Sequence, residues 1–163
     1  MLEIYQQLID SAEFREWQEN NPDCYLTHFY CQLNSNLERT SPWEIGFYNT
    51  KTDKITVFLL SDPIGIKSEE EVFKKEGEVE ELKLEEVKTN LPEAVEIFKK
   101  IKIEKYLKEE LLSSFLILQK FENKTIWNIS AATRSMQILN VKIDARNKEV
   151  VSDQLVSFIQ QNK

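Results

Sequence analysis

The sequence predicts an α+β protein in which helices pack on an antiparallel β-sheet. Runs of alternating apolar and polar residues between polar turns predict strands, most clearly at residues 125–151. Segments whose apolar residues are three or four positions apart precede these runs and predict helices. The order of helix, strand and hairpin occurs at residues 2–60 and again at residues 91–152. We therefore expect a tandem repeat of one α-β-β-β unit, whose two sheets pair edge to edge.

The first unit begins with an expected amphipathic helix over residues 2–18. The helix ends before Pro22, because the residue that precedes a proline avoids the α region. Its apolar side consists of Ile4, Leu8, Ala12, Phe14 and Trp17. A strand is predicted at residues 24–33, with Tyr25, Phe29, Cys31 and Leu33 on one face. Residues 43–48 and 55–60 flank a short polar turn and predict a hairpin.

A connector rich in Glu and Lys occupies residues 66–89. Its few apolar residues include Leu82 and Leu84, which alternate with charged neighbours. We expect these apolar side chains to lie on the core, with a short extended piece at residues 80–87. A disordered connector is the less favoured alternative, because a disordered segment would not place apolar residues at such spacing.

The second unit starts with a helix whose first turn carries a capping box. Asn90 is the expected cap and Glu93 the residue that reaches back to it, and the helix continues to about Glu110. A strongly apolar strand follows at residues 114–121. After the three strands expected at residues 125–151, the spacing of apolar residues in 152–161 predicts a short terminal helix that docks on the core.

These elements suggest three parts along the chain. Residues 1–65 hold the amino-terminal helix and strands, residues 66–89 the connector, and residues 90–163 the second unit with its terminal helix. The length suits two small, closely packed domains, and it equally suits one continuous domain over residues 1–163.

The last hairpin resembles that of the PepSY family. Residues 143–150 read IDARNKEV, close to the family's Val-Asp-Ala-x-Thr-Gly-x-Val, and Trp127 lies upstream in an aromatic strand. Lys148 stands where the family has its turn glycine, so a positive φ is expected on Asn147 rather than on Lys148. The resemblance covers about residues 91–151. It implies a helix packed on an antiparallel sheet, as in protease propeptides and regulators of cell-wall hydrolases, and it carries over no catalytic residue.

Composition excludes several classes of function. The chain has 163 residues and a net charge of −7, so it lacks the general basic footprint of a nucleic-acid-binding protein. No apolar run approaches the ~20 residues of a membrane span, so we expect no membrane insertion. The amino end contains Glu3, Asp10 and Glu13 and has no basic region, unlike a signal peptide. A cytoplasmic location is therefore expected.

The residues that usually carry catalysis or bind metals are scarce. His28 is the only histidine, which excludes a histidine triad or a multi-histidine metal site within the chain. On a strand, Cys31 would point away from Cys24 and His28, so we expect neither a metal site nor a disulfide there. The three glycines are far apart in the sequence, which excludes a phosphate-binding loop. We expect no cofactor, and an enzyme is the less favoured interpretation.

Two functional hypotheses remain. The first is a non-catalytic protein-binding or regulatory module of PepSY-like type, with a protein partner or self-association through a sheet edge or a helix–sheet groove. The alternative is a small-ligand carrier or an enzyme with a cavity between helix and sheet. The candidate binding surface consists of Trp43, Tyr48, Trp127 and Asp144. Core packing of the aromatic residues and capping of its own turn by Asp144 are the competing, more ordinary roles for these side chains.

Overall fold

A computed structural model describes residues 1–71 and 79–157 of the protein. Within this part of the chain, the strands form one antiparallel sheet in the order β4-β3-β2-β1-β5-β6-β7-β8. The strands are β1 (Cys24–Leu33), β2 (Trp43–Asn49), β3 (Lys54–Leu60), β4 (Gly65–Glu71), β5 (Leu111–Phe121), β6 (Lys124–Thr133), β7 (Gln137–Asp144) and β8 (Val150–Ser157). The two central strands, β1 and β5, pair antiparallel, so the first four strands and the last four share a single sheet.

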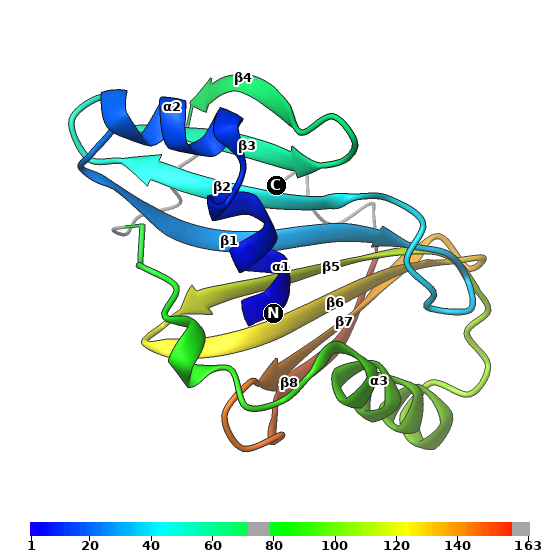
Figure 1. Ribbon diagram of the computed structural model, residues 1–163. Coiled ribbons are helices and arrows are strands. Elements are labelled where there is room, and N and C mark those ends of the chain that lie inside the picture. The colour runs from blue at the N-terminus through cyan, green and yellow to red at the C-terminus, as the bar shows by residue number, and fades with distance from the viewer. Residues whose placement is uncertain (72–78, 158–163) are drawn as a thin grey trace.

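All the described helices lie on the same face of this sheet (Figure 1). They are α1 (Leu2–Ile9), α2 (Ala12–Asn20), α3 (Leu91–Lys105) and the short 3₁₀ helix η1 (Leu84–Glu86). In Figure 1, α2 lies over the first half of the sheet, α1 crosses its middle, and α3 lies over the second half. The predicted α+β class with an antiparallel sheet is therefore confirmed, although more residues lie in strands than in helices.

The amino-terminal helix is broken in two, which corrects the expected single helix over residues 2–18. Ser11 interrupts it and caps α2, because its hydroxyl accepts a hydrogen bond from the Phe14 backbone N–H at 3.2 Å. The break turns Phe14 into the core, where its ring lies 5.0 Å from that of Phe47 and 5.3 Å from that of Phe58. Ala12, expected on the apolar side, is exposed at the start of α2.

Strand β1 has the predicted bounds, and Phe29, Cys31 and Leu33 share a buried face as predicted, but Tyr25 does not. A β-bulge between Leu26 and His28 shifts the register of its pairing with β2. Leu26 therefore joins Phe29 on the helix-covered face, and both side chains are buried. Tyr25, expected on that face, instead pairs with Tyr48 on the opposite face. One additional residue in a strand reverses the orientation of every side chain that precedes it, which simple alternation cannot anticipate.

Helix α3 begins with the predicted capping box. The Asn90 side chain accepts from the Glu93 backbone N–H, and the Glu93 carboxylate accepts from the Asn90 backbone N–H, each at 2.9 Å. The helix ends at Lys105, earlier than the expected Glu110. In the connector, Leu82 and Leu84 are buried as predicted, but a 3₁₀ turn replaces part of the expected extended piece.

The expected terminal helix is wrong for the described residues of the tail, because Val150–Ser157 form strand β8. The same apolar residues that suggested helical spacing also fit a strand, since Leu155 pairs with Leu139 of β7 on the helix-covered face. On the side away from β6, the backbone N–H and C=O groups of β7 need hydrogen-bond partners, and pairing with β8 supplies them. Residues 158–161, which completed the predicted helix, lie outside the described residues.

Candidate functional site

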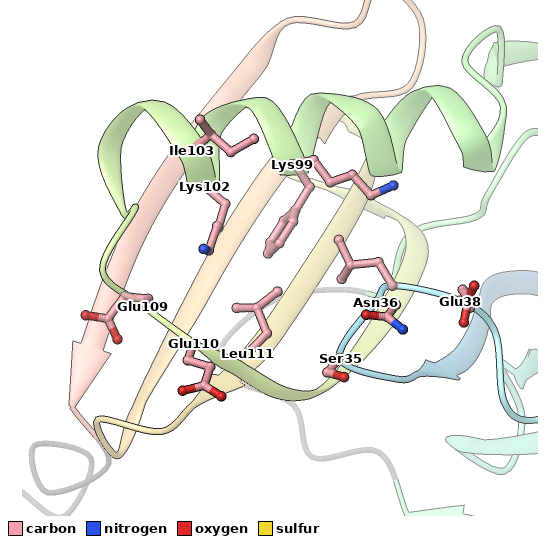
Figure 2. A pocket seen from close by; sticks show the side chains of 11 residues that line it. Ser35, Asn36, Glu38, Lys99, Lys102, Ile103, Glu109, Glu110 and Leu111 are labelled. Carbon is pink, nitrogen blue, oxygen red and sulfur yellow. The ribbon is translucent and has the colours of Figure 1, made fainter.

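A groove of about 730 Å³ lies beside helix α3. Lys99, Lys102 and Ile103 of α3 form one wall (Figure 2). The other wall consists of the turn at residues 35–38, which lies between β1 and β2, and the segment 109–111, which leads into β5. Three segments that are far apart in the sequence therefore meet around one hollow.

The turn at residues 35–38 is held in a strained conformation. Leu37 has a φ of 66°, in the left-handed region that leucine rarely adopts. Asn34 fixes this turn, because its side-chain oxygen accepts from the backbone N–H groups of Asn36 and Glu38 at 2.9 and 3.0 Å. Its carbonyl also accepts from the Leu37 N–H at 3.0 Å. These contacts hold the Leu37 side chain in the groove lining, where it is buried.

Apolar side chains line the interior of the groove, and one apolar side chain of its wall is exposed. Phe98 and Leu37 are buried in the lining, and Leu111 is half-buried beside them. Ile103, in the α3 wall, is 59% exposed. Leu107, Leu112 and Met136, outside the lining, are 69%, 50% and 68% exposed. A 2.9 Å hydrogen bond from the Arg134 N–H to the Glu110 carbonyl joins the segment before β5 to the turn after β6.

The groove walls carry charges of opposite sign. Lysines project from α3, whereas Glu38, Glu109 and Glu110 project from the facing segments (Figure 2). Most of these groups already have partners on the protein: Lys99 pairs with Glu96 at 2.8 Å, and Glu110 pairs with Arg134 at 2.9 Å. The groove therefore has walls of opposite charge, and most of its charged groups are already paired within the protein. These groups do not converge on one point, as they would in a site for a small polar ligand.

The four residues predicted from the sequence as a binding surface do not gather on one exposed surface. Trp43 and Trp127 are 5% and 0% exposed on the helix-covered face. Trp43 packs against Phe29 and lies under the Arg39 guanidinium, whereas the Trp127 indole N–H donates to the Thr89 carbonyl at 2.9 Å. Both tryptophans are thus packing residues, which corrects the expectation that they form a surface.

Tyr48 and Asp144 are buried as well, at 8% exposure each, and on different strands. The Tyr48 hydroxyl donates to the Asp53 carboxylate in the β2–β3 turn, and its ring lies 5.5 Å from that of Tyr25. Asp144 accepts from the Arg146 backbone N–H at 2.8 Å, so it caps its own turn. Capping of its own turn was the alternative to a binding role that the sequence left open for Asp144.

The β7–β8 turn also corrects the expected position of the positive φ. Lys148, not Asn147, has the left-handed conformation, with a φ of 69°. The Lys148 N–H donates to the Asp144 carbonyl at 3.0 Å, and the Asn147 side chain accepts from the Glu149 N–H at 3.0 Å. Asn147 is therefore used as a side-chain acceptor within the turn, which leaves the left-handed position to Lys148.

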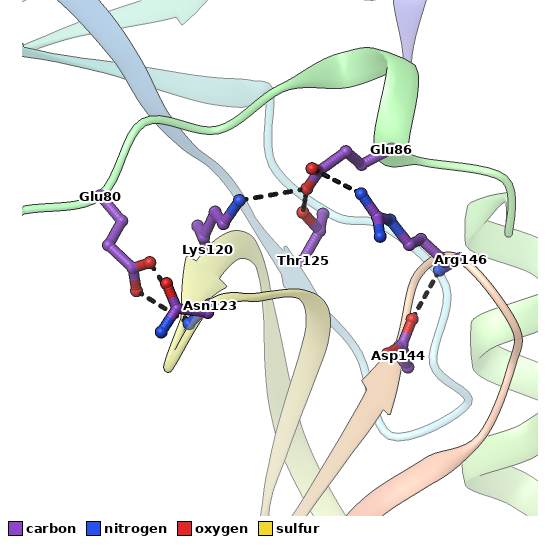
Figure 3. Close-up of polar contacts among 7 residues, drawn as sticks. All are labelled: Glu80, Glu86, Lys120, Asn123, Thr125, Asp144 and Arg146. Carbon is purple, nitrogen blue, oxygen red and sulfur yellow. Dashed lines mark hydrogen bonds and ion pairs between the residues drawn. The ribbon is translucent and has the colours of Figure 1, made fainter.

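A second polar cluster is centred on Glu86 (Figure 3). Its carboxylate accepts from the Thr125 hydroxyl at 2.5 Å and pairs with Arg146 at 2.7 Å and Lys120 at 3.4 Å. The Thr125 hydrogen bond, with help from the two cations, lowers the pKa of Glu86 below its usual value. Glu86 thus fastens the connector to the β5–β6 hairpin and the β7–β8 turn, which is a structural role.

A smaller hollow of about 460 Å³ lies between α1, the connector and β1. Tyr5 and Tyr25 line it together with Glu81. Burial, with a contribution from the Glu81 charge, raises the pKa of Tyr5. The Tyr25 hydroxyl donates to the Val79 carbonyl at 2.6 Å, so it already has an acceptor on the protein.

Among the helices that the structure describes, none has the length and apolar composition needed to cross a bilayer. Within residues 1–71 and 79–157, no three side chains of His, Cys, Asp or Glu come close enough together to hold a metal ion. Cys24 and Cys31 are not joined by a disulfide.

No protein-family model matches this sequence, and no curated protein matches it. Among solved structures, the chain is similar to the crystal structure of a "putative lipoprotein" from Clostridium difficile 630, with a TM-score of 0.49 and 11% sequence identity. The similarity covers 88% of this chain and 90% of that chain. A likeness of this size carries no argument about function.

Proposed function

We propose that this protein is a non-catalytic binding module of PepSY-like type, and that a segment of a partner protein binds in the groove beside α3. One observation carries this proposal: the groove combines a buried apolar lining with an exposed apolar side chain, Ile103, in its wall. A bound segment would bury Ile103, which is costly to leave in water. The oppositely charged walls would fix the direction of a segment that carries charges of both signs.

The form of the groove favours a peptide over a small ligand. Sites for small molecules enclose most of the ligand and direct a few polar groups at it. Here the Lys102 ammonium donates to the Leu107 carbonyl at 3.4 Å, and Glu109 accepts from the Ser135 hydroxyl. Because these groups already have partners, they would contribute little to an enclosed small molecule. They would still complement charges at the rim of a peptide interface.

The PepSY-like part of the proposal is supported by two features. The positive φ lies at Lys148, the position at which the family pattern has glycine. In addition, each half of the described chain begins with helix and continues with four antiparallel strands, and the halves meet at the β1–β5 pair. We infer from this order that the chain arose by duplication of one α+β unit, which would extend the resemblance to the first half.

The experiment is a selection of peptides from a displayed library against the purified protein. We expect it to enrich peptides in which apolar residues are flanked by charges of both signs. The affinity of an enriched peptide, followed by fluorescence anisotropy, should fall at least about ten-fold in the Ile103→Asp variant. Because Ile103 is 59% exposed, the substitution should leave the fold intact, as circular dichroism can check.

Leu2→Asp is the matched control, because Leu2 is an exposed leucine (65%) on α1, outside the groove. This variant should bind the peptide as the unsubstituted protein does. Failure to enrich any peptide, or equal binding by the Ile103→Asp variant, would refute the proposal. A small molecule that remains bound to the purified protein in native mass spectrometry, and that Ile103→Asp releases, would favour the carrier instead.

A further inference from the structure

The two outer strands of the sheet are β4 and β8. Strand β8 reads VVSDQLVS and contains a single charged residue, Asp153. Charged residues on an outer strand are a common protection against pairing with another chain. By this criterion β8 is not protected.

The one charge on β8 is neutralised within the protein. The Asp153 carboxylate accepts from the Lys105 ammonium at 2.6 Å and from the Tyr106 hydroxyl at 2.7 Å. Its side chain is only 14% exposed. Asp153 therefore presents little net charge to a chain that approaches the outer side of β8, and it would not repel an identical strand strongly.

The rest of β8 is regular and neutral. Its ladder with β7 runs without interruption from Lys142 opposite Ser152 to Gln137 opposite Ser157. The single irregularity lies before this ladder, at the start of the strand. Val151 is 39% exposed on the helix-covered face, and Gln154 is exposed on the opposite face. In the described part of the chain, β8 has a pairing strand on one side only.

We propose that β8 pairs antiparallel with β8 of a second copy of this chain, forming a two-fold symmetric dimer with a continuous sheet. A second copy fits because two identical neutral strands complement each other around a two-fold axis. Pairing of β8 with β4 of another copy would instead continue into an open filament. That arrangement would use β4, whereas the dimer leaves β4 outside the contact. This surface contains no groove residue, so the dimer is independent of the proposed function.

The test is the mass of the full-length protein in solution, measured by sedimentation equilibrium over a wide concentration range. The unsubstituted protein should associate to a dimer. Val151→Lys should weaken the dimer by about ten-fold or more, because the two-fold axis places a second lysine on the partner strand. Gln154→Lys should weaken it similarly from the other face, and this exposed position keeps the test valid if Val151→Lys disturbs folding.

Ile66→Lys is the matched control, because Ile66 is a β-branched residue, 50% exposed, on the opposite outer strand β4. This variant should dimerise as the unsubstituted protein does. A monomer at all concentrations would overturn the proposal. So would a dimer that survives Val151→Lys and Gln154→Lys, or one that Ile66→Lys weakens equally.

Discussion

His28 packs so closely over Gly46 that a Cβ atom at position 46 would lie 2.1 Å from the ring Cε1. Its Nδ1 lies 2.9 Å from the Thr27 hydroxyl. Burial lowers the pKa of His28 from 6.5 to about 4, although the nearby Glu44 charge acts in the opposite direction. The imidazole is therefore neutral in the folded protein at physiological pH, and the glycine is what makes room for it.

The His28 environment predicts a pH dependence of stability. The unfolded chain binds a proton at His28 below about pH 6.5, whereas the folded protein does so only near pH 4. The free energy of unfolding should thus be highest above pH 6.5 and should fall by up to roughly 3 kcal/mol between pH 6.5 and 4. Other groups titrate near the lower end of this window, so the contribution of His28 requires a matched variant.

Gly46→Ala supplies this variant. The added methyl group cannot coexist with the ring in its present position, so His28 should rotate toward solvent and its pKa should return toward 6.5. An NMR titration can follow the change without ambiguity, because the chain has one histidine. The stability difference between pH 6.5 and 4 should shrink in the same variant. An unchanged, low pKa in Gly46→Ala would show that burial against Gly46 is not the cause.

Sequence reasoning at the scale of single residues succeeded where a role depends on near neighbours. The capping by Asn90 follows from residues within one helical turn. The burial of Trp43 and Trp127 depends on segments that are distant in the sequence. The presence of a tryptophan alone therefore left both core packing and a binding surface open. Leu37 gave no signal at all, because its left-handed backbone arises from the turn that Asn34 organises.

At the scale of elements, Glu86 connects three segments that the sequence places far apart. It joins η1 to Thr125 of β6 and to Arg146 of the β7–β8 turn. Its side chain is 13% exposed, so these charge-assisted contacts are partly shielded from water. Glu86 therefore holds the connector to the sheet at a defined point.

Glu86→Gln should destabilise the protein by about 1–2 kcal/mol at neutral pH, because charge-assisted hydrogen bonds are replaced by weaker ones. The pKa of Glu86 is lowered in the fold, so its contribution is complete above the ordinary value of 4.5 and is lost as pH falls below it. The difference in unfolding free energy between the two proteins should thus narrow in acid. Urea denaturation at several pH values measures it.

Glu85→Gln serves as the control, because Glu85 is the exposed neighbour of Glu86 in the same 3₁₀ turn. Its unfolding free energy should match that of the unsubstituted protein. Equal destabilisation by both substitutions would contradict the specific role of Glu86.

The elements themselves were largely predictable, since alternation identified the strands and helical spacing identified α3. Four details were not. A cap at Ser11 divides the first helix, and a bulge after Leu26 reverses one end of β1. Pairing with β7 makes Val150–Ser157 a strand, and pairing with β3 makes a strand of Gly65–Glu71, which was assigned to the connector. Each detail depends on a partner that a local pattern does not contain, namely a side-chain cap, a bulged register and an open sheet edge.

At the scale of the whole molecule, the central feature is the pairing of β1 with β5, which joins the two halves in one sheet. Cys31 lies on β1 opposite Leu116 of β5 and is 0% exposed. Burial raises the pKa of its thiol to about 12, with Arg39 acting weakly in the opposite direction. The Cys31 thiolate, which is the form that reacts with disulfide reagents, is thus almost absent until the β1–β5 pair opens.

Cys31 should therefore report on the cooperativity of the molecule. In a Cys24→Ser background, we expect an aromatic disulfide reagent to label Cys31 only through unfolding of the entire sheet. The free energy of opening from labelling rates should then equal the global free energy of unfolding from urea denaturation. A much smaller opening free energy would instead show that the halves separate without unfolding.

The location of the groove could not be predicted from the sequence, although a helix–sheet groove was one of the surfaces considered. Its walls come from residues 35–38, 98–103 and 109–111, which become neighbours only when β1 pairs with β5. The exposed wall residue Ile103 gave a weak signal, because it falls outside the buried stripe of α3. A periodic pattern identifies the residues that face the core, but it cannot say which of the others share a surface.

The most direct test of the binding account is an NMR titration of the isotope-labelled protein with a selected peptide. Backbone amide shifts would locate the contact residue by residue. We predict that the perturbed amides cluster at residues 35–38, 98–103 and 109–111, with little change in α1 and α2. Perturbations centred on the uncovered face of the sheet, or none at saturating peptide, would contradict the assignment of the groove as the binding site.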